Sequence, residues 1–269
     1  MIELLISYVL GIGSSLTTVW LVPRLRKRSL SEKQKELLHF ESGELLIVFP
    51  QSGVRDGGLL PTVSTEDTMA VLNISRALTV AGLSDKIELR DSSKFVGSGA
   101  DDKQKNLILL GGPKFNPVTK ELFSILEKTN RAPFRFESKN EKWRLKESNT
   151  TIHKSQAFAK KNAKTPKEIH EVRQATEAMG LVTDIAIIAG LPNPWELNSR
   201  ILLIAGVRGI GTWGAAKLLR KEGPRLASKL KKQNFSVGDR GLEFWALVDV
   251  RYEEYDIDYH KIRYILKPE

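Results

Sequence analysis

Hydrophobic and polar residues along the chain form blocks that predict buried strands alternating with amphipathic helices. Continuous apolar runs, typical of parallel strands buried on both faces, occupy residues 45–49, 106–110, 184–189 and 201–205. Apolar residues recur with helical spacing over residues 66–81, and further helices are expected at residues 118–128, 166–179 and 214–230. Residues 29–38 are expected to form a short charged helix or a linker. Further strands are expected at residues 86–89, 134–136, 143–145, 242–250 and 262–266. The pattern predicts an α/β fold with a Rossmann-like, mostly parallel sheet and helices on both faces.

The first 28 residues differ from the rest of the chain. Leu4–Val22 contains no charged residue, and as a helix it would be about 28 Å long, close to the thickness of a bilayer core. Basic residues follow it directly, and Trp20 lies beside them, which favours a single-pass anchor with the C-terminal domain in the cytoplasm. A buried core helix is an alternative, because Ser and Thr dilute the hydrophobicity. A cleaved signal peptide fits poorly, because its charges should come first.

Small residues recur every fourth position in this segment, at Ser7, Gly11 and Ser15. This spacing lets transmembrane helices approach closely, so it predicts a homo-oligomer held together in the lipid bilayer. The alternative is that small residues are simply common in short anchors.

Four segments are expected along the chain. They are the anchor with its basic stop (1–28), a first α/β half (29–150), a lysine-rich connecting segment (151–183) and a second α/β half (184–269). Residues 91–105 are expected to form a polar loop within the first half.

Composition narrows the chemistry. The 269 residues include no Cys, which excludes disulfides, Cys-based zinc sites, iron–sulfur clusters and thiol catalysis. The four His residues lack a metal-binding spacing, so we expect neither a metal nor another cofactor. The net charge is +10, and residues 217–232 hold seven Lys or Arg against one Glu. This basic segment could bind nucleic acid, anionic lipid or a protein activator, although a solvated helix face is the commoner explanation.

A glycine pair follows the predicted strand at residues 106–110. Gly111 and Gly112 would let the backbone approach a ligand closely, and Asn116 suits the N-cap of the next helix. Backbone N–H groups at that helix start, with Lys114 beside them, would form an anion site. A tight, well-capped turn with nothing bound is the alternative.

A second glycine-rich turn follows the strand at residues 201–205. Gly209, Gly211 and Gly214 match the GxGxxG spacing of dinucleotide-binding turns, between a buried strand and a helix. The acidic residue expected about 20 positions later is missing, which argues against NAD-dependent chemistry. The candidate ligand residues in this turn are Gly206, Arg208, Gly209, Gly211 and Thr212. Close helix–strand packing would also explain the glycines.

If both turns belong to one sheet, they face the same crevice at the carboxyl ends of its strands, and Ser52 faces it too. Backbone donors and cations there would suit a nucleotide-like ligand. Glu66 and Asp67 could act as an acid–base pair above it, but acids in a first helical turn ordinarily complement the helix dipole. The sequence shows no recognisable Ser/His/Asp set for nucleophilic catalysis, which favours a non-enzymatic protein.

The anchor Leu4–Val22 and the turns Gly111–Asn116 and Gly206–Thr212 together resemble membrane-anchored effectors of prokaryotic antiviral defence. In these systems a CARF-like or SLOG-like sensor, or a short Argonaute partner, controls a transmembrane helix. The resemblance implies that a nucleotide-like ligand or a protein–nucleic-acid partner rearranges an oligomer, so that clustered anchors disrupt the cell membrane. Two other functions remain open: a membrane-anchored enzyme acting on a nucleotide or nucleoside, and a module recruiting nucleic acid through residues 217–232.

Overall fold

The computed structural model describes residues 28–38, 40, 44–54, 61–97, 100–139, 142–147, 182–233, 235, 237–238, 241–253 and 256–266. The expected anchor, with Ser7, Gly11 and Ser15, and the expected helix at residues 166–179 lie outside these described residues. Among the described helices, none combines the length and hydrophobicity needed to cross a bilayer.

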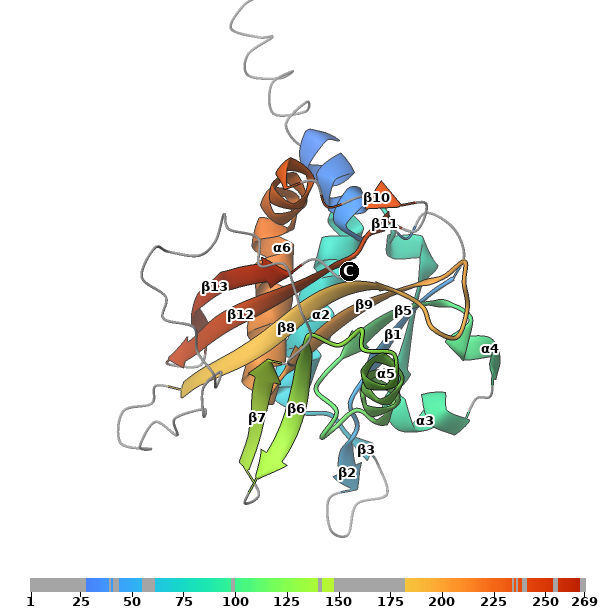
Figure 1. Cartoon of the computed structure of the whole chain (residues 1–269), viewed down its shortest axis with the longest axis vertical. Coiled ribbons are helices and arrows are strands. Elements are labelled where there is room, and N and C mark those ends of the chain that lie inside the picture. The colour runs from blue at the N-terminus through green and yellow to red at the C-terminus, as the bar shows by residue number, and fades with distance from the viewer. Residues whose placement is uncertain are drawn as a thin grey trace, which may run out of the picture.

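A seven-stranded sheet forms the centre of the described chain, in the order β13-β12-β8-β9-β5-β1-β4 (Figure 1). Its strands are β1 (Leu45–Phe49), β4 (Ile87–Asp91), β5 (Asn106–Leu110), β8 (Val182–Pro192), β9 (Arg200–Gly206), β12 (Phe244–Glu253) and β13 (Asp256–Leu266). The pairs β1–β4, β1–β5 and β5–β9 are parallel, whereas β8–β9, β8–β12 and β12–β13 are antiparallel.

The expectation of a mostly parallel sheet is therefore wrong, although the α/β class is correct. The connections explain the difference. Seven residues separate β8 from β9, and two separate β12 from β13. Such short connections reverse the chain direction, because a parallel crossover needs a dozen or more residues. Strands from both expected halves share this one sheet and meet where β5 pairs with β9.

Helices cover both faces of the sheet, as predicted. A helix over residues 28–38, α2 (Thr65–Val80) and α6 (Gly209–Lys232) lie on one face, and α3 (Ser92–Gly97) and α5 (Pro117–Lys128) lie on the other. A hairpin of β6 (Phe134–Lys139) and β7 (Lys142–Glu147) also covers the second face. The smaller elements are β2 (Ser52–Val54), β3 (Pro61–Thr62), η1 (Ser84–Lys86), α4 (Ala100–Lys103), β10 (Val237–Gly238) and β11 (Gly241–Leu242).

Most predicted elements overlap elements of the structure, and several differ in extent or type. The strands predicted at residues 45–49 and 106–110 coincide with β1 and β5. The helix predicted from Gly214 begins at Gly209, because the turn glycines already belong to its first turn. The stretch predicted as a polar loop at residues 91–105 contains α3 and α4, and buried Phe95 fixes α3 to the sheet.

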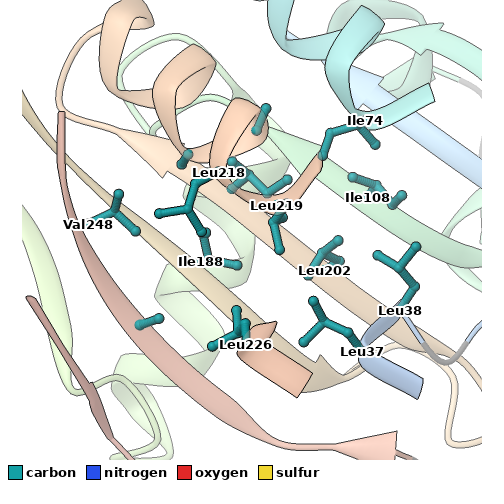
Figure 2. Packing of buried hydrophobic residues seen from close by; sticks show 14 of the residues in the cluster. Leu37, Leu38, Ile74, Ile108, Ile188, Leu202, Leu218, Leu219, Leu226 and Val248 are labelled. Atoms are coloured by element: carbon teal, nitrogen blue, oxygen red, sulfur yellow. The ribbon is translucent and has the colours of Figure 1, made fainter. Parts of the chain in front are cut away.

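The core joins the beginning of the described chain to its second half. Leu37 and Leu38 are buried in the same hydrophobic cluster as Leu202, Leu219 and Leu226 (Figure 2). The helix over residues 28–38 is thereby fixed against α6 by apolar contact.

Candidate functional site

Three helices begin at the carboxyl edge of the parallel strands. Helix α2 follows β1 through the β2–β3 hairpin, α5 follows β5 and α6 follows β9. Helix α5 covers one face of the sheet, whereas α2 and α6 cover the other. After β5 the chain therefore crosses to one face of the sheet, whereas after β1 and after β9 it crosses to the opposite face. This is the topological switch point at which open α/β sheets bind ligands.

The two predicted turns lie in contact at this edge, because β5 and β9 are neighbours. A Cβ atom on Gly112 would lie 2.6 Å from the carbonyl oxygen of Gly206, so only glycine fits there. Gly111 has a φ of +89° and packs against Pro50. The structure therefore answers what the sequence left open: both glycine-rich turns belong to one sheet.

The first turn of α5 is fully capped. The buried Asn116 side chain accepts hydrogen bonds through Oδ1 from the backbone N of Val118 (3.0 Å) and Thr119 (3.3 Å). Its Nδ2 donates to the carbonyl of Leu110 (2.8 Å), and the backbone N of Lys120 donates to the carbonyl of Asn116 (3.0 Å). Pro117 has no N–H to donate. The predicted N-cap is confirmed, and an anion at this helix start would have to replace the Asn116 side chain.

A buried carboxylate occupies the corresponding position at α6. Asp184, near the start of β8, accepts hydrogen bonds through Oδ2 from the backbone N of Arg208 (3.0 Å) and Gly211 (2.6 Å). Its Oδ1 accepts from the backbone N of Ile185 (2.8 Å). Burial raises the pKa of Asp184 to about 7, against the opposing effect of these donors and of the Arg208 charge. The chain thus supplies its own anion where a phosphate would bind a helix N-terminus.

Asp184 escaped the sequence analysis. It begins an apolar run, and an acid in such a run is the one signal that could have drawn attention to it. Its partners at the start of α6 are 24 and 27 residues away, so no local motif connects them.

The glycines of the second turn pack closely. A Cβ atom on Gly211 would lie 2.5 Å from the Asp184 carboxylate, and one on Gly214 would overlap the methyl groups of Val250. The Thr212 hydroxyl accepts a hydrogen bond from the backbone N of Gly206 (3.0 Å) and closes the turn. These contacts favour the packing explanation for the GxGxxG spacing.

The acids at the start of α2 also face this edge. Glu66 packs against Gly209, where an added Cβ would lie 3.0 Å from the Glu66 Cβ. Asp67 hydrogen-bonds the Ser64 hydroxyl (2.8 Å), and Ser64 in turn caps the helix by accepting from the backbone N of Asp67 (3.0 Å). Burial raises the pKa of Asp67, with the Ser64 hydrogen bond opposing it.

The structure gathers nearly all the predicted ligand residues at one edge of the sheet. They are Gly111, Gly112, Lys114, Asn116, Gly206, Arg208, Gly209, Gly211 and Thr212. Ser52 begins β2, close behind β1. Lys114 is exposed, and its ammonium group lies 4.7 Å from the ring centre of Phe115; Arg208 is partly exposed. Among the described residues, no group of His, Asp and Glu is arranged to hold a metal ion.

Comparison with other proteins assigns this chain to no family. No model of a known protein family and no curated protein sequence matches it. The function is therefore argued from the chain's own residues.

Proposed function

We propose that this chain is a membrane-anchored sensor–effector, in which ligand binding at the carboxyl edge of the sheet acts through α6 on an N-terminal transmembrane helix. The observation that carries the proposal is the course of α6. Its first turn lies at the carboxyl edge, and its second half packs against the helix over residues 28–38, which directly follows the basic stop.

Helix α6 is long enough to connect these two places. Its 24 residues span about 36 Å. Toward its C-terminus, Gly223 contacts the Gln34 side chain, and Lys231 pairs with Glu36 (2.7 Å). A shift of α6 would therefore be passed to the helix over residues 28–38, because closely packed interiors transmit strain.

The ligand best suited to this edge is a nucleotide-like anion. Asn116 and Asp184 already satisfy backbone donors of α5 and α6, so the side chains of Lys114 and Arg208 would supply the positive charge. Binding beside Arg208 would change the surroundings of the Asp184 carboxylate that holds the α6 start, and α6 is the element that reaches the anchor.

In this proposal, rearrangement of the soluble domains brings anchors together through the face of Ser7, Gly11 and Ser15, and the clustered helices disrupt the membrane. Such an outcome fits a defence effector whose C-terminal domain lies in the cytoplasm.

Membrane depolarisation in cells expressing the chain tests this function. The full chain should depolarise the membrane when its ligand is present, and a chain without residues 1–28 should not. Replacing Gly11 by Leu should abolish the effect, because the side chain blocks close helix approach. The matched control is Gly13→Leu, on the opposite side of the same helix. Equal activity of both variants would refute oligomerisation through this face.

Ligand binding has its own test, which also decides between sensor and enzyme. Nucleotides that raise the melting temperature of the full chain should lose this effect in Arg208→Ala and Lys114→Ala but keep it in Lys120→Ala, which changes an exposed lysine on α5. The enzyme alternative is favoured by the buried Asp67, whose pKa is raised beside this edge. Nucleotide turnover that disappears in Asp67→Asn would replace the sensor proposal with the enzyme.

A further inference from the structure

Most of the net charge of the chain is concentrated in two segments. Residues 24–38 contain six Lys or Arg and two Glu, and residues 220–232 contain six Lys or Arg and one Glu. Together they account for nine of the ten net positive charges. The described parts of these segments, residues 28–38 and the second half of α6, pack against each other in the structure (Figure 1).

Three exposed cations lie on one side of the second half of α6, which continues as a helix through Pro224. Lys221, Arg225 and Lys232 are separated by four and seven residues, so at 100° per residue they lie within about 40° of one another around the helix. The opposite face of the helix holds buried residues such as Leu226 and Leu230. We define Lys221, Arg225 and Lys232 as the basic stripe. Arg225 lies 3.7 Å from Glu222, an exposed pair that leaves most of its charge available to a partner.

The position of the stripe indicates its partner. If residues 4–22 span the bilayer, as the proposed function requires, the six steps of chain from residue 22 can place residue 28 at most about 22 Å from the membrane surface. The helix that begins there packs on α6, and interhelical distances are about 8–10 Å. The basic stripe is thus tethered close to the headgroups of the cytoplasmic leaflet, which is anionic.

Single-stranded nucleic acid fits this surface less well. Proteins that bind single-stranded nucleic acid combine cations with aromatic side chains on which bases stack. Residues 28–38 and 220–232 contain no Phe, Tyr or Trp. A cationic helix face without aromatics resembles the polar side of a helix that rests on charged headgroups.

We propose that the basic stripe of α6 binds anionic phospholipid headgroups and holds the soluble domain against the membrane that the anchor crosses. This inference rests on the proposed anchor, and it assigns a lipid partner to the basic segment. Each cation near an anionic leaflet contributes about 1 kcal/mol, or about a fivefold change in the contact equilibrium. Removal of two stripe cations should therefore weaken contact with the bilayer by about 25-fold, and screening by salt makes the effect smaller.

A chain without Cys permits a clean test, because one introduced Cys takes a fluorescent label at one site. The full chain would be labelled in Ser228→Cys, which lies on the same side of α6 as the stripe and leaves its three cations in place, or in Ser124→Cys on α5 as the matched control. It would be reconstituted in bilayers of phosphatidylcholine alone or with phosphatidylglycerol. Headgroup-attached quencher lipids report contact. We expect quenching at position 228 only in the bilayers with phosphatidylglycerol, lost in 0.5 M salt, and little quenching at position 124 in either.

Charge variants complete the test. In the Ser228→Cys background, Lys221→Gln with Arg225→Gln should lower contact at least tenfold, whereas Lys94→Gln with Lys128→Gln, which changes two exposed lysines elsewhere, should leave it unchanged. Equal quenching with and without phosphatidylglycerol, or no effect of the stripe variant, overturns the inference. So does displacement of the stripe from the bilayer by duplex DNA, which would identify nucleic acid as the partner.

Flotation separates failure of this inference from failure of the anchor. A chain that floats with phosphatidylcholine vesicles inserts its anchor in the bilayer, and this result does not depend on the basic stripe. A chain that floats only with phosphatidylglycerol vesicles, and only at low salt, supports the stripe and refutes the anchor. A chain that floats with neither refutes both.

Discussion

The contact between Gly223 and Gln34 is where the proposed coupling is most easily perturbed. A Cβ atom on Gly223 would overlap Gln34 Oε1 and lie 2.8 Å from Nε2. The Gln34 side chain is almost fully buried, and its Nε2 donates to the carbonyl of Leu219 (3.4 Å). The amide therefore has no solvent to move into, and Gly223→Ala should push the helix over residues 28–38 away from α6.

The expected magnitude follows from three effects. Alanine stabilises a helix interior by about 1 kcal/mol relative to glycine. Overpacking a closely packed site costs about 1–3 kcal/mol. Loss of the hydrogen bond and burial of an unpaired amide cost a further 1–3 kcal/mol or so. We expect Gly223→Ala to lower the free energy of unfolding by about 1–5 kcal/mol, against the gain that helix propensity alone predicts.

A double-mutant cycle isolates the contact. Gln34→Ala alone should cost about 1 kcal/mol, because Leu219 keeps its intrahelical hydrogen bond. In Gln34→Ala with Gly223→Ala the overlap is gone, so the helix propensity gain of about 1 kcal/mol returns and the coupling energy should be about 2–6 kcal/mol. Urea unfolding of the full chain in detergent, followed by the fluorescence of buried Trp213 and Trp245, measures all four proteins. A Gly223→Ala variant more stable than the parent, or a coupling below about 0.5 kcal/mol, would refute the reasoning.

Two further predictions concern the carboxyl edge. Burial raises the pKa of Asp184 from 3.8 to about 7, so the folded chain binds the proton of this carboxyl group more tightly than the unfolded chain does. Protonation of Asp184 therefore contributes to stability fully below pH 3.8, and the contribution is lost as the pH rises to about 7. Asp184→Asn should remove that slope, and parallel pH dependences of the two urea midpoints would contradict the assignment. Asn116→Ala should cost about 2 kcal/mol, because it removes an N-cap and the hydrogen bond to Leu110. Asn116→Asp keeps the capping acceptor and should cost less, and equal thermal shifts for both variants would count against the cap.

Local pattern was sufficient for the elements that carry their own signal. The apolar runs of β1 and β5 and the periodic spacing of α2 and α5 are properties of short stretches, and they predicted these elements closely. The Asn116 cap was also readable, because an N-cap acts within three residues of its own position. Stretches with weaker patterns, such as α3, acquire their structure by packing against the sheet.

Strand direction and long-range contacts depend on the assembled fold. An apolar run indicates a buried strand but not whether that strand runs parallel or antiparallel to its neighbours, so the reversal at β8 was missed. The candidate site changed for the same reason. The glycine turns were visible in the sequence, but the carboxylate that fills the α6 start comes from β8, and Gln34 meets α6 across 185 residues of chain. Such pairs form only when distant segments are brought together by burial of a common core, which local sequence does not encode.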